Sequence, residues 1–226
     1  FAVPGRTRHY PFRRIRPAAR ASSGVGRAGG LPKNTNVYPR REVPMTTALL
    51  LVDIQNDYFP GGAMEVVGAT EAATQAAKLL AAFRAKSLPV VHVQHISVRP
   101  GATFFLPDTP GVEIHASVRP EPGEPVFQKH FPNSFRETRL LEHLRGAGIS
   151  RLVIAGMMTH MCIDATTRAA ADLGFACLLA HDACATRALS FNGVKVDAAN
   201  VHAAYLAALN GIYARVQSAG ELCDAI

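Results

Sequence analysis

The chain has 226 residues, of which 48% are hydrophobic and 18% are charged, a composition typical of one globular domain with or without an appendage. No apolar run approaches the roughly 18 residues needed to span a bilayer, which argues against a membrane protein. The formal charge of +7 is uneven: residues 1–45 carry ten Lys or Arg and one acid, whereas residues 46–226 are slightly acidic. This distribution argues against a nucleic-acid surface on the main body.

Residues 1–45 differ from the rest in being rich in Pro, Gly and Arg without hydrophobic periodicity. Such a segment cannot bury enough apolar surface to offset the entropy of ordering, so we expect it to be disordered. Its basic composition is also typical of organelle transit peptides, although prolines interrupt any helix there. We favour a third interpretation, a non-native extension ahead of a natural start at Met45. Residues 46–226 are then the folded domain, and an RNA-binding tail is a weaker alternative.

Short apolar runs alternate with amphipathic segments from residue 47 onward. The apolar runs predict strands at 47–54, 89–96, 125–131, 151–156, 175–183 and 212–218. The amphipathic segments predict helices at 70–86, 135–148, 163–174 and 196–211. Residues 97–124, with five Pro and three Gly, are expected to form a long loop. This pattern predicts an α/β fold, a three-layer α/β/α sandwich with a mostly parallel, Rossmann-like sheet of about six strands.

Three residues with catalytic potential lie at or near the ends of predicted strands. Ligands in such sheets bind beyond the carboxyl ends of the strands, where Asp53, Lys129 and Cys162 fall. Cys162 comes at or near the first turn of a helix, where unpaired N–H groups and the helix dipole are expected to lower the thiol pKa. Each residue alone is weak evidence, because an Asp after a strand is often a cap, a lone Lys is usually solvated, and most buried thiols are inert.

Three motifs occur in order at these strand ends: LLLVDIQNDYF, KHFPNSF and GMMTHMCIDATTRAAADLG. From about residue 46 onward the chain resembles the isochorismatase-like cysteine hydrolases. That family includes nicotinamidase, N-carbamoylsarcosine amidase, ureidoacrylate amidase, streptothricin hydrolase and isochorismatase. The resemblance implies a catalytic triad of Asp53, Lys129 and Cys162 and a non-proline cis peptide between Met157 and Met158. The backbone N–H groups of Met158 and Cys162 would then form an oxyanion hole.

The expected activity is hydrolysis of a C–N bond in a small amide, lactam or ureido compound through a thioester, without a cofactor. Asp53 would accept the thiol proton and deliver it to the leaving amine, and Lys129 would supply positive charge beside the thiolate. Two alternatives stay open: vinyl-ether hydrolysis of the isochorismatase type, which does not need the thiol, and a catalytically silent binding subunit. Substrate identity depends on the loop over residues 97–124, whose conformation the sequence does not give.

Several residues near the strand ends are candidates for a substrate pocket. They are Gln55, Phe59, His95, Phe104, Phe135, Thr159 and His160. Aromatic residues at such positions are at least as often ordinary packing, and His95 is equally well explained as a hydrogen-bonded structural histidine.

A metal site is not expected, although nicotinamidases hold a metal with an Asp and two His after the second strand. His92 and His95 are an odd number of residues apart, so on an ideal strand they point to opposite faces, and His115 and Asp108 complete no ligand pattern.

The four cysteines, Cys162, Cys177, Cys184 and Cys223, show no paired spacing, which indicates reduced thiols in a cytoplasmic protein. Cys184 is the rival nucleophile, whereas Cys177 is expected to be in the core. The resemblance also implies a homo-oligomer. The Ala-rich segment VHAAYLAALNG could form its interface or pack on the sheet.

Overall fold

The computed structural model describes residues 46–226. The basic segment of residues 1–45 lies outside the described residues, so the disorder that we expect there stays a prediction.

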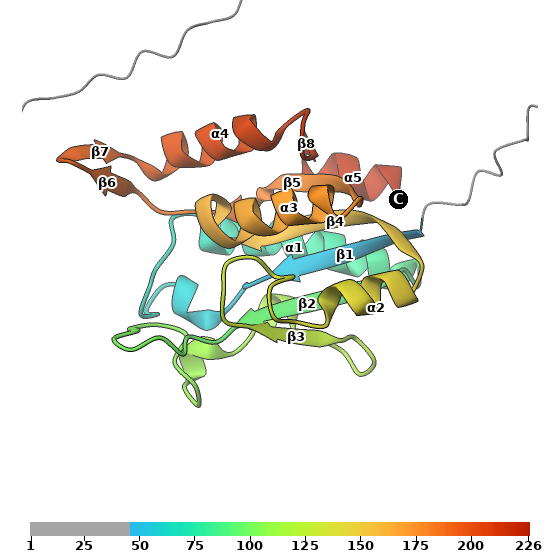
Figure 1. Cartoon of the computed structure of the whole chain (residues 1–226), viewed down its shortest axis with the longest axis horizontal. Helices are drawn as coiled ribbons and strands as arrows, with labels where there is room; N and C mark the ends of the chain where they lie inside the picture. The colour runs from blue at the N-terminus through green and yellow to red at the C-terminus, as the bar shows by residue number, and fades with distance from the viewer. Residues whose placement is uncertain (1–45) are drawn as a thin grey trace, which may run out of the picture. The chain divides into compact units, whose positions relative to one another are not determined.

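Six parallel strands form the central sheet in the order β3-β2-β1-β4-β5-β8 (Figure 1). The strands are β1 (Thr46–Val52), β2 (Val90–His95), β3 (Val126–Lys129), β4 (Ile149–Met157), β5 (Ala176–Ala185) and β8 (Arg215–Gln217). The chain runs outward from β1 to β3 and then returns to add β4 on the other side of β1. The strand order therefore reverses between β1 and β4, where a doubly wound sheet opens a crevice beyond the carboxyl ends.

Helices cover both faces of this sheet. They are α1 (Ala69–Ala85), α2 (Leu140–Gly146), α3 (Asp164–Asp172), α4 (Ala198–Leu209) and α5 (Ala219–Ala225). Because successive strand residues point to opposite faces, Leu49 and Leu51 join the core with α1 and α5, whereas Leu50 and Val52 join the core with α2 and α3. The predicted three-layer α/β/α sandwich is confirmed. Within residues 46–226, none of the helices has the length and apolar character that crossing a membrane requires.

The helix predicted over residues 135–148 is shorter in the structure. It begins only at Leu140, as α2. Glu137 has a φ of 57°, a left-handed conformation that an α-helix does not contain, so the residues before Leu140 form turns instead.

Two elements near the C-terminus were not predicted. The first is an antiparallel hairpin of β6 (Leu189–Phe191) and β7 (Val194–Val196), and the second is α5, which follows the last strand of the sheet. The hairpin turns at Asn192 and Gly193, which both have positive φ, as a type I′ turn requires. Helix α5 begins at a capping box between Ser218 and Glu221.

The long loop over residues 97–124 is fixed to the turn that follows β1. The short helical turns in these regions are η1 (Asn56–Tyr58), η2 (Pro110–Val112) and η3 (Ala116–Val118). The Asp57 carboxylate accepts hydrogen bonds from the Phe105 N–H at 2.5 Å and from the Ala63 N–H at 3.1 Å. Gly111 packs directly on this carboxylate, since a Cβ there would lie 2.0 Å from Asp57 Oδ1. One buried carboxylate therefore holds the loop in place.

Candidate active site

The carboxyl edge of the sheet brings together side chains from four neighbouring strands. Asp53 follows β1, His95 ends β2 and Lys129 ends β3. Cys162 lies in η4 (Thr159–Ile163), a π-helical turn between β4 and α3. A nitrogen of His95, the Cys162 sulfur and a carboxylate oxygen of Asp53 lie within 4.8 Å of one another. The structure thus places the three triad candidates and one pocket candidate at the strand-order reversal.

Asp53 and Lys129 form a fully buried ion pair. Lys129 Nζ lies 2.6 Å from Asp53 Oδ2, and both side chains have 0% exposure. Burial alone lowers the pKa of Lys129, but the charges of Asp53 and the neighbouring Cys162 raise it, and the net direction is upward. Asp53 has a φ of 53°, a left-handed conformation that Asp tolerates better than most residues and that turns the chain sharply at the end of β1.

The Cys162 thiol is also buried, with 4% exposure. Burial raises the pKa of this thiol well above its ordinary value, and the charge of Asp53 raises it further, while Lys129 acts in the opposite direction. The expectation of a thiol pKa lowered by a helix N-terminus is therefore wrong for this structure. The helical turn begins three residues earlier, at Thr159, and desolvation is the largest cause of the upward shift in the thiol pKa.

The backbone before Cys162 requires a glycine. Gly156 has a φ of 136°, and a Cβ there would lie 1.9 Å from the Val52 carbonyl oxygen of β1. The peptide bond between Met157 and Met158, shortly after this glycine, is cis. This is the bond to which the family resemblance assigns that geometry.

His95 is held by the side chain of Gln55. The Gln55 Oε1 accepts from the His95 N–H at 2.7 Å, and Gln55 Nε2 donates to the His95 carbonyl at 2.9 Å and to the Val112 carbonyl at 2.7 Å. The His95 Nδ1 lies 3.5 Å from Lys129 Nζ. Burial, supported by the charge of Lys129 and opposed by that of Asp53, lowers the pKa of His95 to about 4. Gln55 thus binds backbone groups only, whereas the His95 side chain lies beside Asp53, Cys162 and Lys129.

The three aromatic pocket candidates lie in different places. Phe104 and its neighbour Phe105 pack on Tyr58, with ring centroids 6.1 Å and 4.6 Å away, and the Phe105 ring also lies near His95. Phe59 stacks on His115 with centroids 3.7 Å apart. Phe135 instead stacks on Phe175 and packs against the core formed with α2 and α3.

Tyr58 is a buried residue near the site that was not among the predicted site residues. The residue is buried, and burial raises the pKa of its hydroxyl well above the ordinary value. The nearby charges of Cys162 and Asp53 raise this pKa further. Its position in LLLVDIQNDYF, only five residues after Asp53, was the available signal.

Thr159 and His160 contact the neighbouring strand and α4. The Thr159 hydroxyl donates to the Ala185 carbonyl at 3.2 Å and lies 2.9 Å from His202 Nδ1. His160 Nδ1 lies 2.6 Å from the Thr186 hydroxyl. Both side chains bind protein groups, so these contacts stabilise the position of η4, the nucleophile turn that contains Cys162.

The rival cysteines are apart from the charged pair. Cys184 and Cys177 are buried in β5, and burial raises the pKa of each thiol to about 12. Cys223 is part-buried on α5.

The other histidines considered as metal ligands have their own partners. His92 Nε2 lies 2.9 Å from Glu124 Oε2, and His115 Nδ1 lies 2.9 Å from the Ser117 hydroxyl. Among residues 46–226, the one cluster of three potential ligands is Asp53, His95 and Cys162, where the Lys129 ammonium already provides the compensating positive charge.

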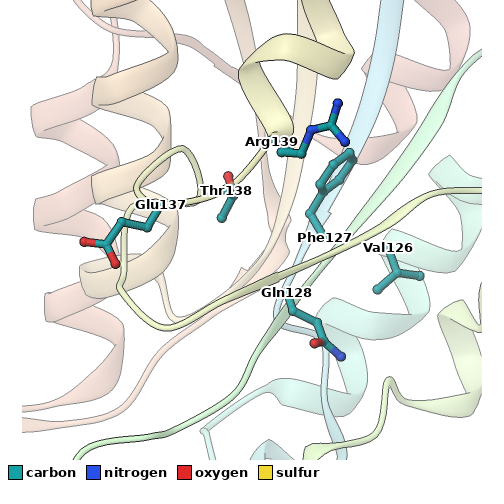
Figure 2. Close-up of a pocket in the computed structure, with 6 residues that line it drawn as sticks. All are labelled: Val126, Phe127, Gln128, Glu137, Thr138 and Arg139. Carbon is teal, nitrogen blue, oxygen red and sulfur yellow. The ribbon is translucent and has the colours of Figure 1, made fainter.

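A pocket of about 590 Å³ lies elsewhere, along the edge strand β3 (Figure 2). Its lining comes from β3 and from the turns that lead into α2: Val126, Phe127, Gln128, Glu137, Thr138 and Arg139. The two charged residues in it, Glu137 and Arg139, are exposed. The pocket contains none of the buried ionisable groups described above, so we place the candidate active site at Asp53, Lys129, Cys162 and His95.

The chain is similar to several known proteins. Residues 47–219 match the model of the isochorismatase domain. The isochorismatase family protein YddQ of Bacillus subtilis is 53% identical over 77% of this chain and 97% of its own length. A streptothricin hydrolase of Streptomyces noursei is 35% identical over 81% of this chain and 71% of its length. The ureidoacrylate amidohydrolase RutB of Variovorax paradoxus is 26% identical over 76% of this chain and 83% of its length.

A solved structure assigned to an isochorismatase hydrolase of Oleispira antarctica has a TM-score of 0.78 and 56% identity, covering 80% of this chain and 97% of that one. The six-stranded α/β/α fold and these relatives define a hydrolase of the isochorismatase type. The chain belongs to the isochorismatase family.

Proposed function

We propose that this hydrolase cleaves a C–N bond of a small amide, lactam or ureido compound with Cys162 as nucleophile. The observation that carries the proposal is the fully buried Asp53–Lys129 ion pair, with a carboxylate oxygen within 4.8 Å of the Cys162 sulfur. A buried ion pair is costly to desolvate and is weak evidence for stability alone, so its place beside a thiol favours a chemical role. The amidohydrolase among the relatives supports the same reaction class.

The raised pKa of Cys162 decides how the thiol is activated. At neutral pH the thiol holds its proton, so attack requires a base in contact with it. The Asp53 carboxylate takes this proton as the sulfur bonds to the substrate carbonyl carbon. Lys129 keeps the site near neutrality, because its positive charge balances the thiolate once Asp53 is protonated.

The remaining steps return the proton. As the tetrahedral intermediate collapses, the C–N bond breaks, Asp53 protonates the leaving nitrogen, and a thioester remains on Cys162. Water then attacks the thioester, gives its proton to Asp53, and the acid product leaves as the thiol is regenerated. The backbone N–H groups of Met158 and Cys162 are the proposed donors to the oxyanion, with the nucleophile turn held by Thr159.

Two alternative functions are considered beside amide cleavage. The first is vinyl-ether hydrolysis, and the second is a binding subunit without catalytic activity. Vinyl-ether cleavage uses Asp53 as a proton donor to carbon and leaves the thiol idle. The ion pair alone serves both reactions, so the presence of Cys162 beside it favours amide cleavage.

The test is an ammonia-release screen over small amides with the intact protein, Cys162→Ala, and Cys177→Ala as the control that removes a buried thiol outside the site. We expect kcat/KM to fall at least about a thousandfold for Cys162→Ala and to change little for Cys177→Ala. Mass spectrometry should detect an acyl adduct on Cys162 during turnover. Cleavage of a vinyl ether by Cys162→Ala would favour vinyl-ether hydrolysis, and no turnover of any amide by the intact protein would favour the binding subunit.

We also propose that the protein is a homo-oligomer with α4 in the interface. This helix has no charged residue and buries only Val201 and Leu209, and the adjoining hairpin exposes Phe191 at 78%. An uncharged helix with exposed apolar neighbours is typical of an interface. Ala207→Glu should lower the mass measured by sedimentation equilibrium. Val98→Glu, at another exposed apolar residue, should leave it unchanged.

The domain assignment is a further proposal. Residues 46–226 form the hydrolase domain, and residues 1–45 are an appended basic segment. A chain that begins at Met45 should therefore keep the amidase activity of the full chain.

A further inference from the structure

His95 is the member of the site that reaches toward solvent. Asp53 and Lys129 have 0% side-chain exposure and Cys162 has 4%, whereas His95 is only part-buried. A substrate that approaches the Cys162 sulfur therefore meets the imidazole before it meets the ion pair. The chemistry that His95 offers depends on which of its nitrogens carries a proton.

Lys129 determines that proton's position. An ammonium group has donors and no acceptor, and Lys129 Nζ lies 3.5 Å from His95 Nδ1. Nδ1 must then act as the acceptor in this contact. Because the low pKa of His95 keeps its imidazole neutral at neutral pH, the single ring proton is on Nε2. His95 thus presents an N–H donor on the side away from Lys129.

The backbone that carries the imidazole is also held in place. Gln55 binds both the N–H and the carbonyl of His95, and a third hydrogen bond ties the same amide to Val112 in the long loop. The Phe105 ring lies 5.9 Å from the His95 ring and is itself fixed through its N–H to Asp57. A donor carried on an anchored backbone, with the Phe105 ring beside it, contributes to selectivity because its position is largely set before a substrate arrives.

We propose that His95 Nε2–H donates a hydrogen bond to a second oxygen of the substrate, on an atom close to the attacked carbonyl carbon, and so selects amides that carry such an oxygen. The inference rests on the proposed amidase function and narrows its substrate class to amides with a neighbouring carbonyl or carboxylate. Simple alkyl amides leave the donor unpaired and are poorer substrates.

A pair of small amides of similar shape, 3-oxobutanamide and butanamide, tests whether His95 selects substrates with a second oxygen, and malonamate extends the comparison. 3-Oxobutanamide has a second carbonyl where butanamide has a methylene group, and malonamate places a carboxylate there instead. For the intact protein we expect kcat/KM to be about tenfold higher for 3-oxobutanamide than for butanamide. His95→Leu should bring that ratio close to one. His95→Gln, whose amide can donate from a similar position, should keep part of it. A higher kcat/KM for malonamate than for 3-oxobutanamide identifies a carboxylate as the natural acceptor.

The proposal is overturned if the ratio of kcat/KM for 3-oxobutanamide to kcat/KM for butanamide is near one in the intact protein. It is also overturned if His95→Leu leaves this ratio unchanged. The ¹⁵N spectrum of the imidazole provides a test without turnover: a proton on Nε2 is expected, and a proton on Nδ1 contradicts the inference. If no amide is hydrolysed, the proposed function fails. The selection is then judged by titrating Cys162→Ala with 3-oxobutanamide and butanamide, where equal affinities count against it.

Discussion

The Lys129 ammonium lies 2.6 Å from Asp53 Oδ2 in a place that solvent does not reach. Each charge is compensated by the other, and the same carboxylate lies within reach of the Cys162 thiol. The pair therefore combines a structural role with an acceptor for the thiol proton. Removing one charge and removing both have different consequences.

Lys129→Met should destabilise the protein by about 3–5 kcal/mol, because it leaves the Asp53 carboxylate buried and unpaired. The double variant Asp53→Asn with Lys129→Met should recover much of that free energy of unfolding, without recovering turnover. Urea denaturation measures both. Arg139→Ala, which breaks an exposed pair with Glu142, is the control and should change stability by less than about 1 kcal/mol. Equal stabilities for the Lys129→Met single and double variants would show that the two charges are not coupled.

The free energy of unfolding should fall as the pH rises above the ordinary cysteine pKa of 9.0. Burial raises the folded-state pKa of Cys177 and Cys184 to about 12. The unfolded chain thus loses these protons first, and each thiol contributes a decrease of about 1.4 kcal/mol per pH unit between its unfolded and folded pKa values. Cys177→Val removes one titrating group, so its stability should decline less steeply with pH. Parallel curves for the variant and the original protein would contradict this assignment.

Gly156→Ala should destabilise the protein by more than about 1 kcal/mol and displace the nucleophile turn, since the new Cβ would lie 1.9 Å from the Val52 carbonyl at a positive φ. Gly146→Ala is the matched control. No atom lies within 4 Å of a Cβ at that position, the last of α2, so the change should be neutral or stabilising by about 1 kcal/mol. Thermal unfolding of the two variants measures the contrast, and similar melting temperatures would argue against the close approach of β1 and β4.

Glu124 should contribute to stability against acid. Although burial acts to raise its pKa, hydrogen bonds from Arg84, the Glu121 N–H and His92 lower it to about 2, below the ordinary value of 4.5. Its contribution is therefore present above pH 4.5 and is lost as the pH falls through about 2. Glu124→Gln should lower stability at neutral pH and make unfolding less dependent on pH in that acidic range. An unchanged acid profile of the free energy of unfolding would contradict the role of this carboxylate.

Much of the fold could be predicted from the sequence, because the strands of a sheet covered on both faces are apolar along their whole length. The Leu49–Val52 run shows this pattern directly. The hairpin and α5 also have local signals, Asn192-Gly193 and the Ser218 to Glu221 spacing, but neither signal belongs to a long apolar run. Both elements are short, and their few apolar positions do not establish a period.

The site was predictable where topology positions residues and not where packing decides their environment. Lys129 ends a parallel strand, and Asp53 and Cys162 follow two others, so the sheet brings the three residues together. The raised pKa of Cys162 depends on desolvation by neighbours distant in sequence, which no local pattern reports. In the same way, Phe105 lies beside His95 and Phe135 beside Phe175 because of tertiary contacts, which no local sequence pattern reports.

The enclosure of Cys162 has a protective consequence. Peroxides and disulfides react with thiolates that they can reach, and this sulfur has 4% exposure and a pKa raised by burial. In the resting protein it is thus a poor target for oxidation to sulfenic acid or for mixed-disulfide formation. A nucleophile that becomes reactive only when Asp53 takes its proton is preserved between turnovers, even where oxidants are abundant.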